Sequence, residues 1–259
     1  MVGLARKAAK AMVLPAGLVT RRRPGDVAIL LYHRLGEGGA EIEMPTGAFE
    51  RQLAHVVRKD HPITLDDALD GAGGIVITVD DGYLDFYEQL LPLLVRYRVP
   101  AVLYLATGLV ANGNGSAPEG LTWDHLREIV ASGLVTVGSH THSHIDLARA
   151  SEREAEDEMR RSKDLIEDRL GVECRHFAYP FAVASAPAER AARRIFDSAA
   201  LAWSTNRRGR LDPYRLGRLP VLRSDGQWLF RAKTAGLLDG EAYLYRALRR
   251  GPWRAPESR

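Results

Sequence analysis

The feature that most constrains the fold of this 259-residue chain is an alternation of short apolar segments with amphipathic ones from residue 26 onward. The apolar segments are often β-branched, which is typical of strands. We expect strands at residues 27–32, 75–79, 101–105, 135–139, 176–179, 199–203 and 219–222. We expect helices between them at residues 48–58, 83–97, 123–131, 152–170, 188–196 and 227–236. Apolar strands separated by helices predict the α/β class, with a parallel barrel or a doubly wound layer.

No linker divides the chain, so we expect a single domain over residues 26–238. A basic N-terminal arm (1–25) precedes it, and a basic C-terminal helix and tail (239–259) follow it. The net charge of +3 is too small to indicate a nucleic-acid partner. The single cysteine, Cys174, cannot form an internal disulfide or a Cys-based zinc site, so any metal must be held by histidines and carboxylates.

The N-terminal arm combines basic residues with an apolar run at 11–19. This run is shorter than the roughly 20 residues that span a bilayer. A signal peptide stays open as an alternative, although three arginines follow the run in place of a small-residue cleavage site. We favour an uncleaved arm that contacts an anionic membrane surface, with a solvated arm as the equal alternative. The expected location is cytoplasmic or peripheral at the inner face of the membrane, with export less favoured.

Two adjacent carboxylates, Asp80 and Asp81, follow the expected strand at 75–79. Active groups of parallel α/β sheets gather at the carboxyl ends of the strands. Two carboxylates brought out of water so close together are costly, and a bound cation would remove that cost. Taken alone, the pair is also explained as a cap for the helix expected at 83–97.

Three histidines, His140, His142 and His144, end another expected strand. Histidines four residues apart face the same side of a helical turn, and in an extended segment all three would share a face. Two of them joined to Asp81 suit zinc or another first-row divalent ion, with positions open for water and substrate. Asp80 is then free to take a proton from water whose pKa the ion lowers from 15.7 toward about 7 to 9. This combination is typical of a hydrolase.

Residues 78–82 read Thr-Val-Asp-Asp-Gly and resemble the first motif, TFDDG, of the NodB-like polysaccharide deacetylases of carbohydrate esterase family 4. Residues 139–144 read Ser-His-Thr-His-Ser-His and resemble the second motif of that family, HTxxH or HSxxH. The similarity extends from about residue 27 to residue 237. It implies a single-domain, distorted (β/α) barrel with about seven parallel strands.

The resemblance also implies roles for individual residues. Asp80 would be the general base. Asp81, His140 and His144 would hold a divalent metal, with Zn²⁺ favoured over other first-row ions, and His142 would stand outside the metal set.

The chain departs from the family pattern in its third motif, where Ala178 replaces an arginine that orients the base. The sequence Phe-Ala-Tyr-Pro at 177–180 is similar to the poly-N-acetylglucosamine deacetylase branch, which also lacks that arginine. By the same similarity Arg218, just before the last expected strand, substitutes for it. The backbone N–H of Phe181 matches the family position that helps to hold the developing oxyanion.

The late histidine that serves as the usual general acid is absent, because no histidine follows His176. His33 ends the first expected strand and should open onto the same rim as Asp80 and His140. Our hypothesis is that His33 is the general acid; the alternative is a histidine that only braces the rim.

The activity implied by the resemblance is metal-dependent removal of an N-acetyl group from a polysaccharide, oligosaccharide or glycolipid intermediate. Deacetylation of a small glycosidic metabolite is one alternative. A catalytically inactive, metal-containing carbohydrate-binding protein is another, favoured by the missing arginine and late histidine. Retention of Asp80, which metal binding alone does not require, argues against inactivity. The expected partners are an N-acetylated glycan or glycolipid and, through the arm, a membrane surface.

Overall fold

The computed structural model describes residues 22, 25–111, 119–203, 206 and 211–237. The apolar run at 11–19 and the expected C-terminal helix and tail lie outside these ranges. The proposed division into arm, domain and tail therefore stays a prediction. None of the helices within the described ranges is both long and apolar enough to cross a bilayer.

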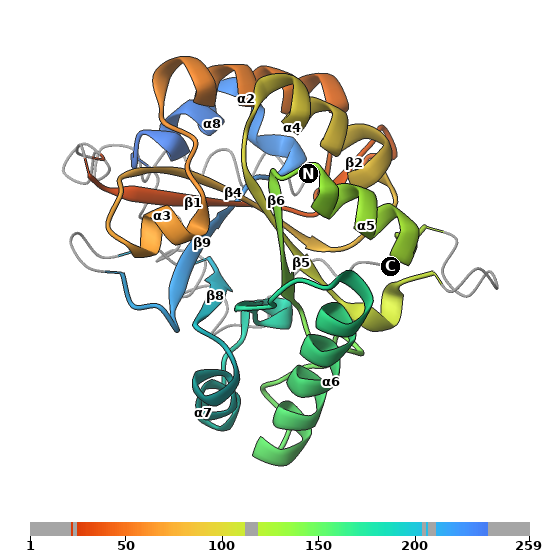
Figure 1. Cartoon of the computed structure of the whole chain (residues 1–259). Helices are drawn as coiled ribbons and strands as arrows, with labels where there is room; N and C mark the ends of the chain where they lie inside the picture. The colour runs from red at the N-terminus through yellow and green to blue at the C-terminus, as the bar shows by residue number, and fades with distance from the viewer. Residues whose placement is uncertain (1–21, 23–24, 112–118, 204–205, 207–210, 238–259) are drawn as a thin grey trace.

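Seven parallel strands close into a barrel (Figure 1). In spatial order they are β1 (Val27–Tyr32), β4 (Gly74–Asp81), β5 (Ala101–Leu105), β6 (Val135–Ser139), β7 (His176–Ala178), β8 (Ser198–Ala202) and β9 (Leu216–Pro220). The barrel closes where β1 pairs with β9, with Ile29 opposite Arg218. The expected seven-stranded parallel (β/α) barrel is confirmed.

Helices cover the outside of the barrel, as Figure 1 shows. They are α2 (Thr46–Lys59), α4 (Leu91–Tyr97), α5 (Trp123–Ala131), α6 (Glu152–Leu170), α7 (Ala186–Ile195) and α8 (Gly226–Thr234). The short helix α3 (Leu65–Leu69) instead packs Leu65 and Ala68 against the core inside the barrel. α2 packs against α4 and α8, and α6 packs against α5 and α7. The capping box expected at the start of α6 is present, since Ser151 and Glu154 bond to each other's backbone N–H, and Gly171 ends the helix at φ 65°.

Alternate strand residues face opposite sides of the barrel wall, as the two-residue period of a strand requires. In β4, Ile75, Ile77 and Val79 pack in the large core between strands and helices. Val76 belongs instead to a smaller core inside the barrel, with Val102 of β5. Both faces of the strands are therefore buried, which explains why they appear in the sequence as continuous apolar runs.

Two expected elements need correction. The helix expected at 83–97 is a π-helical turn, Phe86–Leu90, followed by α4. Pro92 in the first turn of α4 has no N–H to continue an α-helical ladder from the preceding turn. The last strand runs from Leu216 to Pro220 instead of 219–222, so Arg218 lies within it and not before it. A charged residue in the middle of a strand interrupts the apolar run by which a strand is recognised in a sequence.

Several short elements were not expected from the sequence. They are the two-residue strands β2 (Arg34–Leu35) and β3 (Glu43–Met44), the helix α3, and the 3₁₀ turns Thr107–Leu109, Pro180–Ala182 and Arg223–Asp225. Strand β8 ends at Ala202, so Trp203 follows the strand and does not end it. Elements of one turn or less carry too little periodicity to be recognised in a sequence.

Candidate active site

Asp81, His140 and His144 converge at the carboxyl end of the barrel. Asp81 is the last residue of β4, and both histidines follow β6. The Oδ1 atom of Asp81 lies 3.6 Å from Nε2 of His140 and 3.4 Å from Nε2 of His144. One ligand atom from each of the three residues lies within 4.8 Å of the other two. Oδ1 of Asp81 is buried without a hydrogen-bond partner in the described residues, which fits a carboxylate oxygen that binds a cation.

The ring of His140 is fixed by the barrel wall. Its Nδ1 atom lies 2.7 Å from the carbonyl oxygen of Ala178, so Nδ1–H donates to that carbonyl and Nε2 presents its lone pair toward Asp81. Burial lowers the pKa of His140 to about 4. The imidazole is therefore neutral at pH 7, which is the form that binds metals.

The charges around the site are coupled. Burial raises the pKa of Asp81, but the neighbouring imidazoles, His144 first, outweigh it and hold that pKa far below its ordinary value. Burial lowers the pKa of His144, and Asp81 reverses this, so the pKa of His144 lies above its ordinary value. Asp81 is thus an ionised carboxylate that is largely shielded from water, where its electrostatic attraction for a divalent ion is strongest.

Strained backbone surrounds the three residues. Asp81 (φ 76°), Thr141 (φ 65°), His144 (φ 54°) and Phe181 (φ 55°) all adopt a left-handed conformation that side chains disfavour. Such conformations persist only where neighbouring structure holds them. Here the backbone N–H of His140 donates to Leu105 O at 2.9 Å, and other bonds of this kind join the loops after β4, β5 and β6.

Asp80 faces the barrel interior beside this cluster and is held by Arg218. Nη1 of Arg218 donates to Oδ1 of Asp80 at 2.6 Å, and Nη2 donates to Oδ2 at 2.8 Å. Arg218 is only 1% exposed, and its guanidinium lies 5.1 Å from the ring centroid of Tyr104. Burial raises the pKa of Asp80, yet the charge and hydrogen bonds of Arg218 bring it below its ordinary value. Oδ2 of Asp80 also lies 3.7 Å from Nε2 of His140.

The remaining sequence-predicted residues lie around this centre. His33 directly follows β1 and so lies at the carboxyl end of the barrel, as Asp80 and Asp81 do. The ring of Phe181 is half exposed and lies edge-on to the ring of His144, 4.7 Å between centroids. His142 points elsewhere: its Nδ1 lies 2.9 Å from Oγ1 of Thr107, outside the metal-ligand group.

Sequence reasoning missed Tyr83 and Tyr104. Burial, and after it the charge of Asp81, raises the pKa of Tyr83 to about 12. The guanidinium of Arg34 lies 4.4 Å from the centre of the Tyr83 ring. Tyr104 supports Arg218 from inside the barrel. Both had a signal in the sequence, because Tyr83 directly follows the Asp-Asp-Gly motif and Tyr104 occupies an inward position of its strand.

Comparison with known proteins places these residues in a family. The polysaccharide deacetylase family model matches residues 70–195, which include both aspartates of the site, His140 and His144, but neither His33 nor Arg218. YxkH of Bacillus subtilis (strain 168), named as a polysaccharide deacetylase, is 23% identical over 171 residues, or 62% of this chain. The match spans 59% of the length of YxkH, less than two thirds of it.

Solved structures share the whole fold. IcaB from Ammonifex degensii is 22% identical with a TM-score of 0.72, covering 83% of this chain and 97% of that one. The Streptococcus pyogenes deacetylase PplD, solved in complex with acetate, is 24% identical with a TM-score of 0.69, covering 82% of this chain and 99% of that one. At these identities the likeness establishes the barrel fold.

Proposed function

This chain is a member of the NodB-like polysaccharide deacetylase family, and from that premise we propose that it removes the N-acetyl group from an N-acetylated glycan or glycolipid by metal-dependent hydrolysis. The observation that carries the proposal is the pairing of two carboxylates with separate tasks. Asp81 lies among the imidazoles of a metal-ligand set, while Asp80 beside it is kept ionised by Arg218. A binding protein has no need of the second carboxylate.

Asp81, His140 and His144 would hold the ion, which when bound supplies a Lewis acid for the acetyl carbonyl and lowers the pKa of water. Zn²⁺ suits this donor set, as do other first-row divalent ions. Nδ1–H of His140 is committed to the Ala178 carbonyl, so the ring cannot turn away from the ligand position.

Asp80 would take one proton from the attacking water as its oxygen bonds to the acetyl carbon. The carbonyl oxygen gains negative charge, and the backbone N–H of Phe181 would donate to it. When the carbon–nitrogen bond breaks, the nitrogen takes the electron pair and His33 would give it a proton. The acetic acid that forms ionises to acetate, Asp80 returns its proton to solvent, and His33 regains a proton from solvent, so the products are acetate and a free amino group.

The proposal is tested by acetate release from N-acetylglucosamine oligomers and from chromogenic acetyl esters. We expect release that a chelator abolishes and Zn²⁺ restores. Asp80→Asn should retain one bound metal ion, measured by mass spectrometry of the metal content, and should lose about 10²- to 10⁴-fold in rate, as removal of a general base does. Asp124→Asn, which changes an exposed carboxylate paired with Arg127 alone among the described residues, is the matched control and should behave as wild type.

Release that survives the chelator would contradict the mechanism. Metal binding without release from any acetylated substrate would support the alternative of a carbohydrate-binding protein.

A further inference from the structure

His142 is the histidine of the Ser-His-Thr-His-Ser-His segment that the proposed function does not use, and its contacts are with the loop of the neighbouring strand. Its Nδ1 atom lies 2.9 Å from Oγ1 of Thr107, in the 3₁₀ turn that follows β5. Its backbone oxygen accepts a hydrogen bond from the N–H of Gly108 at 2.7 Å. His142 therefore joins the loop after β6 to the turn after β5 through both its side chain and its backbone.

Backbone hydrogen bonds continue the pairing of β5 with β6 past the ends of both strands. The N–H of His140 donates to Leu105 O at 2.9 Å, and the N–H of Thr107 donates to Thr141 O at 3.3 Å. The loop of residues 140–144, called the ligand loop below, carries two of the three candidate metal ligands. This loop is therefore bonded along its length to the turn after β5.

Gly108 shows how closely the turn and the ligand loop approach each other. A Cβ atom at this position would lie 2.6 Å from the backbone oxygen of His142, closer than a Cβ atom can come. Because the contacted atom is backbone, it cannot rotate out of the way as the end of a side chain could. The bond from Gly108 to His142 therefore requires a residue without a side chain.

The ligand loop needs such support because its backbone is strained. Thr141 (φ 65°) and His144 (φ 54°) both have left-handed conformations, which persist only where the surrounding structure holds them. A loop released from its contacts would relax to a conformation with negative φ. The Nε2 atoms of His140 and His144 would then leave their positions 3.6 Å and 3.4 Å from Oδ1 of Asp81.

We propose that His142 and Thr107 form a positioning pair that holds the ligand loop in the conformation that binds the metal, a role that rests on the proposed metal-dependent function. The side chain of Thr107 is buried, and its hydroxyl can both donate and accept, so the bond to Nδ1 forms in either tautomer of the ring. His142 acts through other residues, since the ligand atoms that lie within 4.8 Å of one another in the described residues belong to Asp81, His140 and His144. Removing a group that orients metal ligands typically lowers metal affinity by about 10- to 100-fold.

The affinity of the full chain for Zn²⁺, measured by competition with a chromophoric chelator, tests the proposal. Thr107→Val keeps the size and branching of the side chain but removes the hydroxyl, so it should weaken Zn²⁺ binding about tenfold. Thr107→Ser keeps the hydroxyl and should bind Zn²⁺ nearly as tightly as the wild type.

A second pair of variants changes the other partner. In His142→Asn an amide atom takes the place of Nδ1 and can still bond to Thr107, whereas the side chain of His142→Leu cannot. His142→Leu should therefore bind Zn²⁺ about tenfold more weakly, and His142→Asn should keep most of the affinity. His61→Leu changes an exposed histidine and is the control, with the affinity of the wild type expected.

Hydrogen exchange of the metal-free chain in EDTA measures whether the pair holds the loop. The amides of residues 139–145 should exchange about fivefold faster in Thr107→Val, as the loss of one hydrogen bond predicts. In Thr107→Ser they should exchange at the wild-type rate. Urea unfolding of the same samples shows whether each variant is folded at the concentrations used.

A Zn²⁺ affinity equal to that of the wild type in folded Thr107→Val and His142→Leu would overturn the proposal, because the pair would then be structural only. The proposal is also wrong if His142→Asn loses as much affinity as His142→Leu while Thr107→Val loses none, since His142 would then be a ligand itself. A wild-type chain that binds no Zn²⁺ would contradict the proposed function, and the exchange rates would still decide whether the pair holds the loop.

Discussion

Arg218 and Asp80 form a buried ion pair on which the chemistry of the site depends. Both side chains are almost inaccessible to water, and the guanidinium contacts both carboxylate oxygens. Removing one partner of such a pair leaves an uncompensated buried charge. Ala178 and Arg218 both face the barrel interior, where a small residue at one position leaves volume for a large residue at the other. The arginine therefore reaches the base from β9 and not from β7.

Arg218→Lys should separate the role of the paired N–H donors from that of the charge. Lysine keeps the positive charge but cannot contact both oxygens of Asp80 in the same way. We expect the pKa of Asp80 to rise, because burial raises this pKa and a lysine would offset that effect less than Arg218 does. The acidic limb of the pH profile of kcat should move to higher pH, and kcat should fall with little change in KM. Acetate release measured across the pH range checks this.

Arg215→Lys is the matched control, because Arg215 is exposed and pairs with Glu189 at the surface. Its pH profile should match the wild type. An unchanged profile in Arg218→Lys as well would mean that Arg218 does not position the base.

At the level of single residues the sequence was informative where motifs are local. The Asp-Asp-Gly and the closely spaced histidines predicted a metal set of Asp81 with two histidines, and the family resemblance selected His140 and His144, which the barrel brings together with Asp81. Partners that are far apart in the sequence were harder to predict. The role of Arg218 came from the family resemblance, and the contact of Tyr104 with Arg218 depends on which side chains of β5 and β9 face the barrel interior. The role of His33 as general acid and that of the Phe181 backbone N–H as a hydrogen-bond donor to the oxyanion stay predictions.

Among the structural elements, β6 shows how tightly the barrel interior is packed. A Cβ atom on Gly138 would lie 2.8 Å from the carbonyl oxygen of His176 and 2.8 Å from Cδ1 of Tyr104. Both are closer than a Cβ contact allows, and one of the contacted atoms is backbone. Gly138 thus lets β6 approach β7 while the ring of Tyr104 stays under Arg218.

Gly138→Ala should destabilise the protein by about 1 to 3 kcal/mol, the usual cost of adding a methyl group to a filled core. It should also lower the deacetylation rate, because Tyr104 must shift and Arg218 rests against it. Urea unfolding gives the first quantity and acetate release the second. Gly47→Ala is the control: Gly47 lies in the first turn of α2, where a Cβ meets only the end of Arg51 at 3.4 Å. That change should be neutral or stabilise by about 0.4 to 1 kcal/mol, and equal effects of the two substitutions would contradict the packing argument.

The length and burial of an element decided how well the sequence predicted it. Six of the seven strands were placed within a residue or two at each end because both faces are apolar. Strand β9 was displaced because Arg218 interrupts its pattern, and its neutralising partner is 138 residues away. The helix α3 was missed although Thr64 and Asp67 form a capping box at its start. A single helical turn after the capping box is too short to show the 3.6-residue hydrophobic period of a helix.

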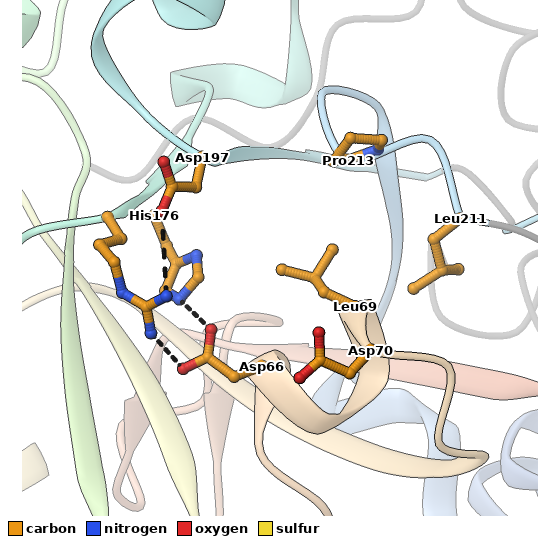
Figure 2. A pocket seen from close by; sticks show the side chains of 8 residues that line it. Asp66, Leu69, Asp70, His176, Asp197, Leu211 and Pro213 are labelled. Atoms are coloured by element: carbon orange, nitrogen blue, oxygen red, sulfur yellow. Dashed lines mark hydrogen bonds and ion pairs between the residues drawn. The ribbon is translucent and has the colours of Figure 1, made fainter.

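At the scale of the whole molecule, two polar regions lie at opposite ends of the barrel, and the core inside the barrel lies between them. The candidate catalytic residues end the strands at one side, and a carboxylate-lined cavity of about 500 Å³ lies where the strands begin (Figure 2). Between them the interior is filled by small and apolar residues such as Ile29, Val76 and Ala200. The strand pattern left a barrel or a doubly wound layer open, and the family resemblance selected the barrel. The cavity was not predicted, because its lining comes from four segments with no shared motif. Membrane contact by the arm and a cytoplasmic location stay predictions.

The buried histidines make the metal-free protein sensitive to acid. His140 has an unfolded pKa near 6.5 and a folded pKa of about 4. A group whose folded pKa is depressed contributes fully above its unfolded pKa, and that contribution is lost as the pH falls toward the folded value. The pKa of His176 is also lowered, so it acts in the same direction. The pKa of His144 is raised, so its contribution is complete below pH 6.5 and is lost only at higher pH. Asp80 and Asp81 lose theirs only below about pH 4.

Between pH 6.5 and 5, His140 alone should therefore lower the free energy of unfolding by up to about 2 kcal/mol, since each pH unit changes it by at most about 1.4 kcal/mol. Urea unfolding in EDTA at several pH values measures this slope. His140→Gln should have a shallower slope, whatever its stability at pH 7.5, because it removes one proton-binding group from the unfolded state. His61→Gln changes an exposed histidine and should keep the wild-type slope. If the slope of His140→Gln equals that of the wild type, His140 is not buried as a neutral imidazole, and its readiness to bind a metal at pH 7 loses its support.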